Sequence, residues 1–150
     1  DVNKEQVNHF YKKIATHYKG NLKGKHFAMW GLAFKPDTDD VREAPAHYLI
    51  KFLLDAGATV KAYDPEANNT TKAVLGDIIQ YAETSDETLM DADALIVVTE
   101  WKEFRNPDFD IIKKSLKAPV IFDGRNLYDL DKLNQLKFTY YSIGRTDIIN

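Results

Sequence analysis

The chain of 150 residues contains no cysteine. No disulfide, thiolate nucleophile or sulfur-bound zinc site can therefore form within it. Long apolar runs are also missing, since none approaches the roughly 18 residues of a membrane-spanning helix. The first residues, DVNKEQVNHFYKK, carry too many charges for a secretory signal. We therefore expect a cytoplasmic protein with no membrane partner.

An excess of one charge is missing as well. The 20 Lys and Arg residues face 23 Asp and Glu residues, which gives a net charge of −3 with acids and bases intermixed. Because no basic field is present to attract a nucleic-acid backbone, we expect no nucleic-acid partner. The histidines have no neighbour at metal-ligand spacing, so we expect no metal site. They are His9, His17, His26 and His47.

What is present is the composition of one globular domain, with 44% hydrophobic and 29% charged residues. The pattern predicts strands alternating with helices. Expected strands cover 26–30, 58–65, 78–82, 93–99, 118–124 and 137–144. Expected helices cover 7–18, 46–57, 66–77, 85–92, 108–116 and 129–136. This alternation indicates an α/β fold with three α/β/α layers, a Rossmann-like doubly wound parallel sheet, preceded by an N-terminal helix.

Three details of these elements are open to test. The strand over 93–99 is the most apolar in the chain, so it should be central. The helix over 66–77 should be weak or irregular, and the helix over 85–92 should be capped by Ser85 or Asp86. The chain also starts without methionine and with little room for a helix cap. We expect it to be a segment of a longer protein.

The loop GLAFKPDTDDVREAP, residues 31–45, follows the first expected strand, where a dinucleotide-binding unit carries three glycines. Here Ala33, Phe34 and Lys35 stand in place of the later glycines, which disfavours a backbone phosphate cradle. Lys35 and Arg42 could neutralise a phosphate with their side chains instead. Alternatively, both are solvated and balanced by the acids of the loop. These acids are Asp37, Asp39, Asp40 and Glu43.

The DGRN segment follows the fifth expected strand and places Arg125 at the same sheet edge as Lys35. Two cations that converge on one edge make an anion site more probable than either cation alone. Asp123, the last residue before this turn, is expected to brace it rather than to perform catalysis.

Other polar and aromatic residues at this edge allow two interpretations each. Asp64 follows the second strand, where a ribose-binding acid would lie, but without the glycine loop we interpret it mainly as a turn residue. Trp101 and Phe104 could stack on a base, although core packing is favoured. Glu100 could act as an acid or base, yet its spacing indicates no partner, so an exposed carboxylate is the default.

The sequence contains the stretches GKHFAMWGLAFKPDTDDVREAPA, AYDPEA, VVTEW, FDGRN and YYSIGR. Together they resemble one family, the UDP-glucose 6-dehydrogenases and their relatives that act on GDP-mannose and UDP-N-acetylmannosamine. They look like the family's C-terminal nucleotide-sugar-binding domain. Val2, Asn3 and Gln6, in a VNxxQ pattern, resemble the end of its central helix. The resemblance implies that residues 1–20 end this linker helix and residues 21–150 form the UDP-sugar-binding domain.

The resemblance also implies an activity, the oxidation of UDP-glucose to UDP-glucuronate by two hydride transfers to NAD. Phe34, Lys35 and Arg125 match residues that contact the nucleotide sugar, and Arg42 matches one that reaches the NAD phosphates. The catalytic cysteine and most of the NAD site would lie in an N-terminal domain absent from this chain. The chain would thus bind the UDP part of UDP-glucose or UDP-glucuronate without catalysing the reaction alone.

Two alternatives to a UDP-glucose 6-dehydrogenase are open. The chain could belong to a UDP-N-acetylmannosamine or GDP-mannose dehydrogenase, because the sugar is held mainly by residues outside it. It could also be a stand-alone nucleotide-binding module with no enzyme attached. In the full-length enzyme we expect a homodimer or a larger assembly.

Overall fold

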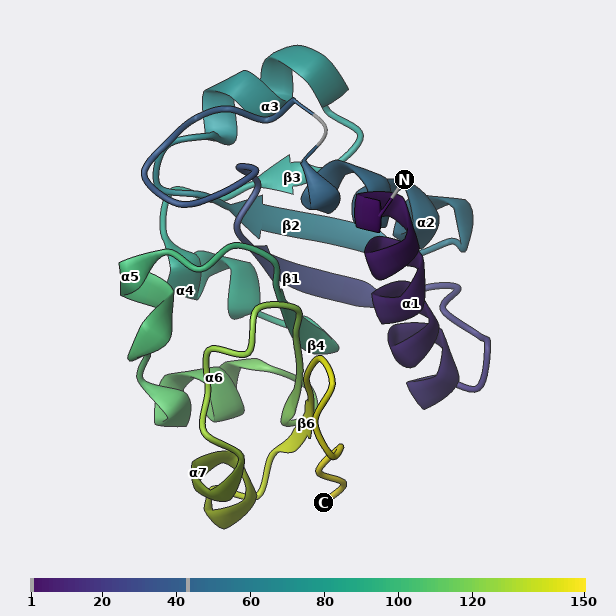
Figure 1. The fold of residues 1–150 in the computed structure, drawn as a ribbon, viewed down its shortest axis with the longest axis vertical. Coiled ribbons are helices and arrows are strands. Elements are labelled where there is room, and N and C mark those ends of the chain that lie inside the picture. The colour runs from purple at the N-terminus through teal and green to yellow at the C-terminus, as the bar shows by residue number, and fades with distance from the viewer. Residues whose placement is uncertain (1, 43) are drawn as a thin grey trace.

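The computed structural model describes residues 2–42 and 44–150, without the side chains of Val2 and Asn3. The described side chains therefore exclude Val2 and Asn3 of the VNxxQ pattern. They also exclude Glu43, one of the acids of the first loop. The sheet of six parallel strands has the order β3-β2-β1-β4-β5-β6 (Figure 1). The strands are β1 (His26–Trp30), β2 (Thr59–Tyr63), β3 (Gln80–Tyr81), β4 (Ala94–Val97), β5 (Val120–Asp123) and β6 (Thr139–Tyr141).

The helices flank this sheet and complete the expected doubly wound fold (Figure 1). They are α1 (Val2–His17), α2 (Pro45–Asp55), α3 (Asn68–Leu75), α4 (Ser85–Leu89), α5 (Lys102–Arg105), α6 (Phe109–Ser115) and α7 (Leu130–Gln135). The chain builds the sheet outward from β1 to β3, then returns to place β4 on the other side of β1. This confirms that the strand within 93–99 is central. The order of the strands reverses between β1 and β4, where sheets of this type bind ligands.

Each face of the sheet buries its own hydrophobic core. Alternate residues of β1 separate the two, since Phe27 and Met29 join one cluster whereas Ala28 and Trp30 join the other. Helix α1 contributes Val7, Phe10 and Ile14 to the first cluster, at the spacing of one helical face. The N-terminal helix is therefore packed into the same core as the sheet.

Two expected helices differ from the expectations for physical reasons. Helix α4 is capped by Thr84, whose Oγ1 accepts the Glu87 N–H at 3.3 Å, so the expectation of Ser85 or Asp86 is wrong. Helix α3 is a continuous eight-residue helix rather than an irregular one. Its first residue is anchored because Asn68 accepts the Asp64 N–H at 2.9 Å and donates to the Ala82 carbonyl at 2.8 Å.

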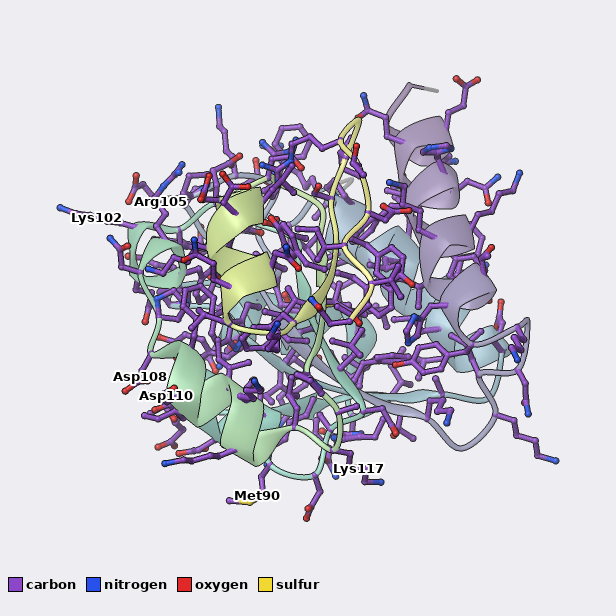
Figure 2. All side chains as sticks on the ribbon, turned by 90° about the horizontal axis from the view of Figure 1, so that it is seen from below. Met90, Lys102, Arg105, Asp108, Asp110 and Lys117 are labelled. Carbon is purple, nitrogen blue, oxygen red and sulfur yellow. The ribbon has the colours of Figure 1, made fainter. Side chains whose placement is uncertain are left out.

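Helix α5 was not expected, because four residues are too few to reveal a period. Its Phe104 is fully buried and stacks on Trp30 with ring centroids 5.2 Å apart. Lys102 and Arg105 of the same helix point away from the molecule (Figure 2). One buried ring thus fixes an otherwise polar turn of helix.

The two outer strands of the sheet differ in length and in what lies beside them. Strand β3 has only two residues. Beside β6, the Tyr140 N–H donates to the Ile148 carbonyl at 2.8 Å, and the Ile148 N–H donates to the Tyr140 carbonyl at 3.0 Å. The last residues of the chain therefore return to pair with the outer side of β6.

Within residues 2–42 and 44–150, no helix combines the length and the apolar character needed to cross a membrane.

Candidate functional site

The loops after β1 and β4 meet closely at the reversal point of the sheet. Gly31 has a φ of +103°, and a Cβ at this position would overlap the side chain of Thr99. The Thr99 hydroxyl donates to the Ala33 carbonyl at 2.9 Å. The one glycine of the first loop therefore serves a close approach between two loops, which a side chain would prevent.

Asp64, at the end of β2, is 2% exposed and accepts five N–H groups. Its Oδ1 accepts from the two backbone amides of its own turn, Glu66 and Ala67, both at 2.9 Å. These two bonds confirm the interpretation of Asp64 as a turn residue. Its Oδ2 crosses to the first loop and accepts the amides of Leu32 at 2.8 Å and Ala33 at 3.0 Å. Those amides are thus occupied by a carboxylate of the chain and cannot cradle a phosphate.

The fifth donor to Asp64 is the indole of Trp101, at 3.1 Å. Trp101 is 7% exposed and belongs, with Phe104, to the second core cluster. Core packing is therefore confirmed for both aromatic residues. Because this indole contacts Asp64, the loops after β1, β2 and β4 share one buried carboxylate.

Arg125, after β5, forms an ion pair with Glu100 of the loop after β4. The Arg125 Nε–H donates to Glu100 Oε2 at 2.6 Å, and Nη2 contacts the same oxygen. The Glu100 side chain is only 21% exposed, against 44% for Arg125. The expectation that Glu100 has no partner is wrong, because its partner lies 25 residues away in the sequence on the neighbouring strand end.

Asp123, the last residue of β5, is fully buried and braces the turn that carries Arg125. Its Oδ1 accepts the Arg125 N–H at 2.8 Å, and its Oδ2 accepts the Leu127 N–H at 2.7 Å and the Tyr140 hydroxyl at 2.6 Å. Burial, and then the charge of Asp123, raise the pKa of Tyr140, so its hydroxyl stays protonated and donates. The expected bracing role of Asp123 is confirmed.

Arg125 also lines a cleft of about 560 Å³ at the carboxyl ends of β4 and β5. The cleft lies between the N-terminal half of α1, the start of α2 and the loops that follow β4, β5 and β6. The residues that line it are Glu5, Gln6, Val7, His9, Phe10, Pro45, Leu49, Val98, Gly124, Arg125, Asn126 and Ile143. Reasoning from the loops missed the contribution of α1, for which the only signal was Gln6 in the VNxxQ pattern.

The other three predicted site residues do not line this cleft. Phe34 is 42% exposed and Lys35 is exposed, and within the part of the chain that the structure describes Lys35 forms no ion pair. Arg42 is 88% exposed and donates from Nε and Nη2 to the Asp40 carboxylate, both at 3.0 Å. The Arg42 hydrogen bonds lower the pKa of Asp40 to about 2. The structure thus brings Arg125 to a cleft and leaves Phe34, Lys35 and Arg42 on an open loop.

Among the described residues, no group of three or more His, Asp or Glu side chains is arranged to hold a metal ion.

Comparison with known proteins assigns this fold to a family. The family model described as "UDP-glucose/GDP-mannose dehydrogenase family, UDP binding domain" matches residues 28–130. The chain is 40% identical over 148 residues to UDP-glucose 6-dehydrogenase of Pseudomonas aeruginosa, covering 95% of this chain and 33% of that protein. It is 41% identical over 145 residues to UDP-glucose 6-dehydrogenase TuaD of Bacillus subtilis, covering 97% of this chain and 31% of that protein. The chain thus spans about a third of the length of the curated relatives it matches.

Solved structures agree with the sequence relatives. A UDP-glucose dehydrogenase from Pyrobaculum islandicum superposes with a TM-score of 0.76 at 31% identity, covering 95% of this chain and 30% of that one. An NDP-N-acetyl-D-galactosaminuronic acid dehydrogenase from Methanosarcina mazei superposes with a TM-score of 0.79 at 30% identity, covering 95% and 29%. From the matched residues and the fold together, the chain belongs to the UDP-glucose/GDP-mannose dehydrogenase family and matches its UDP binding domain.

Proposed function

We propose that this chain is the UDP-binding domain of an NAD-dependent UDP-glucose 6-dehydrogenase, which oxidises UDP-glucose to UDP-glucuronate. Residues 21–150 would form this domain, and residues 1–20 would end the central linker helix. The observation that carries the proposal is the position of Arg125, which lines a cleft at the carboxyl edge of the sheet in a chain of this family. The identity of 40% and 41% to UDP-glucose 6-dehydrogenases favours UDP-glucose over the other sugars.

In this proposal, the side chains of Arg125 and Lys35 bind the diphosphate. A guanidinium has more N–H groups than Glu100 occupies, so Arg125 can keep its ion pair and still donate to phosphate oxygens. Lys35 would contribute a second positive charge from the loop after β1. The exposed ring of Phe34 offers an apolar surface to the nucleotide sugar.

The cofactor NAD does not fit the first loop of this chain. The backbone amides of Leu32 and Ala33, which a dinucleotide cradle would need, are bound to Asp64. We therefore place most of the NAD site, together with the catalytic cysteine, in the part of the enzyme outside this chain. NAD bound there would accept the hydrides from the sugar, while the exposed Arg42 would reach its phosphates.

The proposal is tested by thermal unfolding of the chain with UDP, GDP or NAD. A ligand present at about 100 times its dissociation constant raises the free energy of unfolding by roughly 2.7 kcal/mol. We expect this stabilisation from UDP and much less from GDP and NAD. Stabilisation by GDP alone would point to a GDP-mannose dehydrogenase, and no response to any nucleotide would overturn the proposal.

Two cation variants of the full-length enzyme test the division of roles. Arg42→Ala should lower catalytic efficiency for NAD on the order of tenfold or more, with UDP affinity nearly unchanged. Lys35→Ala should show the opposite pattern, with UDP binding weakened first. Equal losses of UDP affinity in the two variants would place both cations in one diphosphate site. The expected homodimer or larger assembly and the cytoplasmic location also stay predictions.

A further inference from the structure

The YYSIGR segment, residues 140–145, has no role in the proposed function, yet its Tyr140 contacts the turn that carries Arg125 and its Arg145 contacts Tyr140. The Arg145 guanidinium donates from Nη2 to the Tyr140 hydroxyl at 2.8 Å. That hydroxyl donates to Asp123 Oδ2 at 2.6 Å, and Asp123 Oδ1 accepts the Arg125 N–H at 2.8 Å. A continuous series of hydrogen bonds therefore joins the loop after β6 to the backbone of Arg125.

The sheet register explains why Tyr140 can reach Asp123. Tyr140 pairs with Ile121 in the neighbouring parallel strand, and both side chains belong to the second core cluster. Asp123 lies two residues further along β5 and so faces the same side of the sheet. The length of the tyrosine side chain carries its hydroxyl across this offset. Tyr140 therefore adds a side-chain donor to the two backbone amides that the buried carboxylate accepts.

Arg145 is itself held in place. Its Nε donates to the Ser142 hydroxyl at 3.0 Å, and its Nη1 donates to the Tyr128 carbonyl at 3.1 Å. With the bond to Tyr140, three groups of the chain fix its guanidinium. The positive charge of Arg145 therefore lies beside the tyrosine that contacts the buried Asp123 carboxylate.

The same turn contains a left-handed residue. Asn126, directly after Arg125, has a φ of +56°, a conformation that asparagine adopts more readily than most residues but less favourably than glycine. Its amide side chain bonds both backbone groups of Ile143, at 2.9 and 2.8 Å. The turn is thus held by Asn126 at one end and by Asp123 at the other, with Arg125 between them.

We propose that Tyr140 is a positioning residue, which with Arg145 fixes Asp123 so that the turn over 123–127 presents the Arg125 guanidinium to a diphosphate. The diphosphate ligand in this inference rests on the proposed function. The hydrogen bonds that hold the turn do not depend on it. Tyr140 does not line the cleft. Its hydroxyl also donates to the Tyr128 carbonyl, at 3.3 Å, but it reaches the Arg125 turn through the Asp123 carboxylate.

The test compares Tyr140→Phe with Tyr128→Phe as a matched control. Both changes delete one buried phenol hydroxyl, but the Tyr128 hydroxyl donates to the Phe104 carbonyl, at 2.7 Å, and not to the Arg125 turn. Amide hydrogen exchange is measured at Arg125 and Leu127 without ligand. We expect exchange about threefold or more faster in Tyr140→Phe than in the control. Equal exchange in the two variants would overturn the positioning role.

UDP affinity, measured by calorimetry, gives the second readout. Tyr140→Phe should weaken UDP binding about three- to tenfold, whereas Tyr128→Phe should not. In an Arg125→Ala background the effect of Tyr140→Phe should disappear, because the two residues act on one contact. If Tyr140→Phe weakened UDP binding equally in the Arg125→Ala background, Tyr140 would not act through Arg125, and the inference would be overturned.

The two readouts separate failure of the inference from failure of the proposed function. If the parent chain binds no UDP but exchange at Arg125 rises in Tyr140→Phe, the proposed function fails and the bracing of the turn stands. If UDP binds and Arg125→Ala weakens it, while Tyr140→Phe changes neither readout, the proposed function stands and the positioning role falls.

Discussion

Two loops at the carboxyl edge of the sheet each carry a cation predicted to bind phosphate, and the structure holds these cations differently. Arg125 is fixed at its backbone by Asp123 and at its guanidinium by Glu100. Lys35 lies on a loop whose base is fixed by Asp64, but its own side chain is exposed. Arg125 therefore loses little conformational freedom on binding an anion, whereas Lys35 loses more. Arg125 is thus a preorganised contact, and Lys35 is an adaptable one.

The largest expected effect comes from removing the anchor of the Lys35 loop. Asp64→Asn keeps the size of the side chain but turns an amide NH2 toward N–H groups that now donate to a carboxylate. We expect a loss of about 2–4 kcal/mol in the free energy of unfolding, measured by urea denaturation. Asp129→Asn is the control, because Asp129 is an exposed cap of α7 where Asn serves equally well. Equal free energies of unfolding in the two variants would show that Asp64 does not anchor the loop.

The next effect compares the two cations directly. Arg125→Ala should weaken UDP binding by about 1.5–3 kcal/mol, the range for hydrogen bonds to charged groups. It also leaves the Glu100 carboxylate without its partner beside the anion, so its effect should exceed that of Lys35→Ala. Calorimetry on both variants measures the difference. If Lys35→Ala weakened UDP binding more than Arg125→Ala does, the adaptable contact would contribute more than the preorganised one, and the comparison would be wrong.

A smaller effect of opposite sign is expected at Glu100. Glu100→Gln removes a negative charge next to the diphosphate while an amide oxygen can still accept from Arg125, so UDP should bind more tightly by about 0.5–1 kcal/mol. Glu103→Gln, three residues further on, is the control, because Glu103 accepts from Tyr63 at 3.0 Å and not from Arg125. The gain should shrink as the salt concentration rises. Weaker binding in Glu100→Gln would show that the full charge is needed to orient Arg125.

The smallest effect concerns Arg42 at the far end of the first loop. The hydrogen bonds from Arg42 lower the pKa of Asp40 to about 2, so the pair should persist until the pH falls toward that value. Titration of the Asp40 carboxyl by NMR measures this directly. Arg42→Ala should return the pKa toward the ordinary value of 3.8, and Lys35→Ala should change it far less because Lys35 acts only through space. An unchanged pKa in Arg42→Ala would show that the pair does not form in solution.

The fold could be predicted from the sequence because it depends on repeated signals. Every expected strand contains an observed strand, and the apolar run around Leu95 and Ile96 marked the central one. Helix α5 and the cap at Thr84 could not be predicted, since each depends on a single local contact rather than on a period.

For the candidate site, the sequence could predict which edge of the sheet carries Arg125 but not the contacts that hold it. The position of Arg125 after a buried strand was enough to place it at the carboxyl edge. Its pairing with Glu100 and the contact of Asp64 with Trp101 join residues 25 and 37 positions apart, which no local pattern reveals. These pairings depend on which strands are neighbours, and strand order follows from tertiary packing.

The return of Ile148 along the outer side of β6 has a consequence for behaviour at high concentration. The backbone groups of Tyr140 on this side are occupied by the chain itself, so another molecule cannot extend the sheet there. At the opposite margin, β3 offers only two residues as a template. Edge-to-edge association, the usual route by which open sheets aggregate, is thus discouraged at both margins by different means.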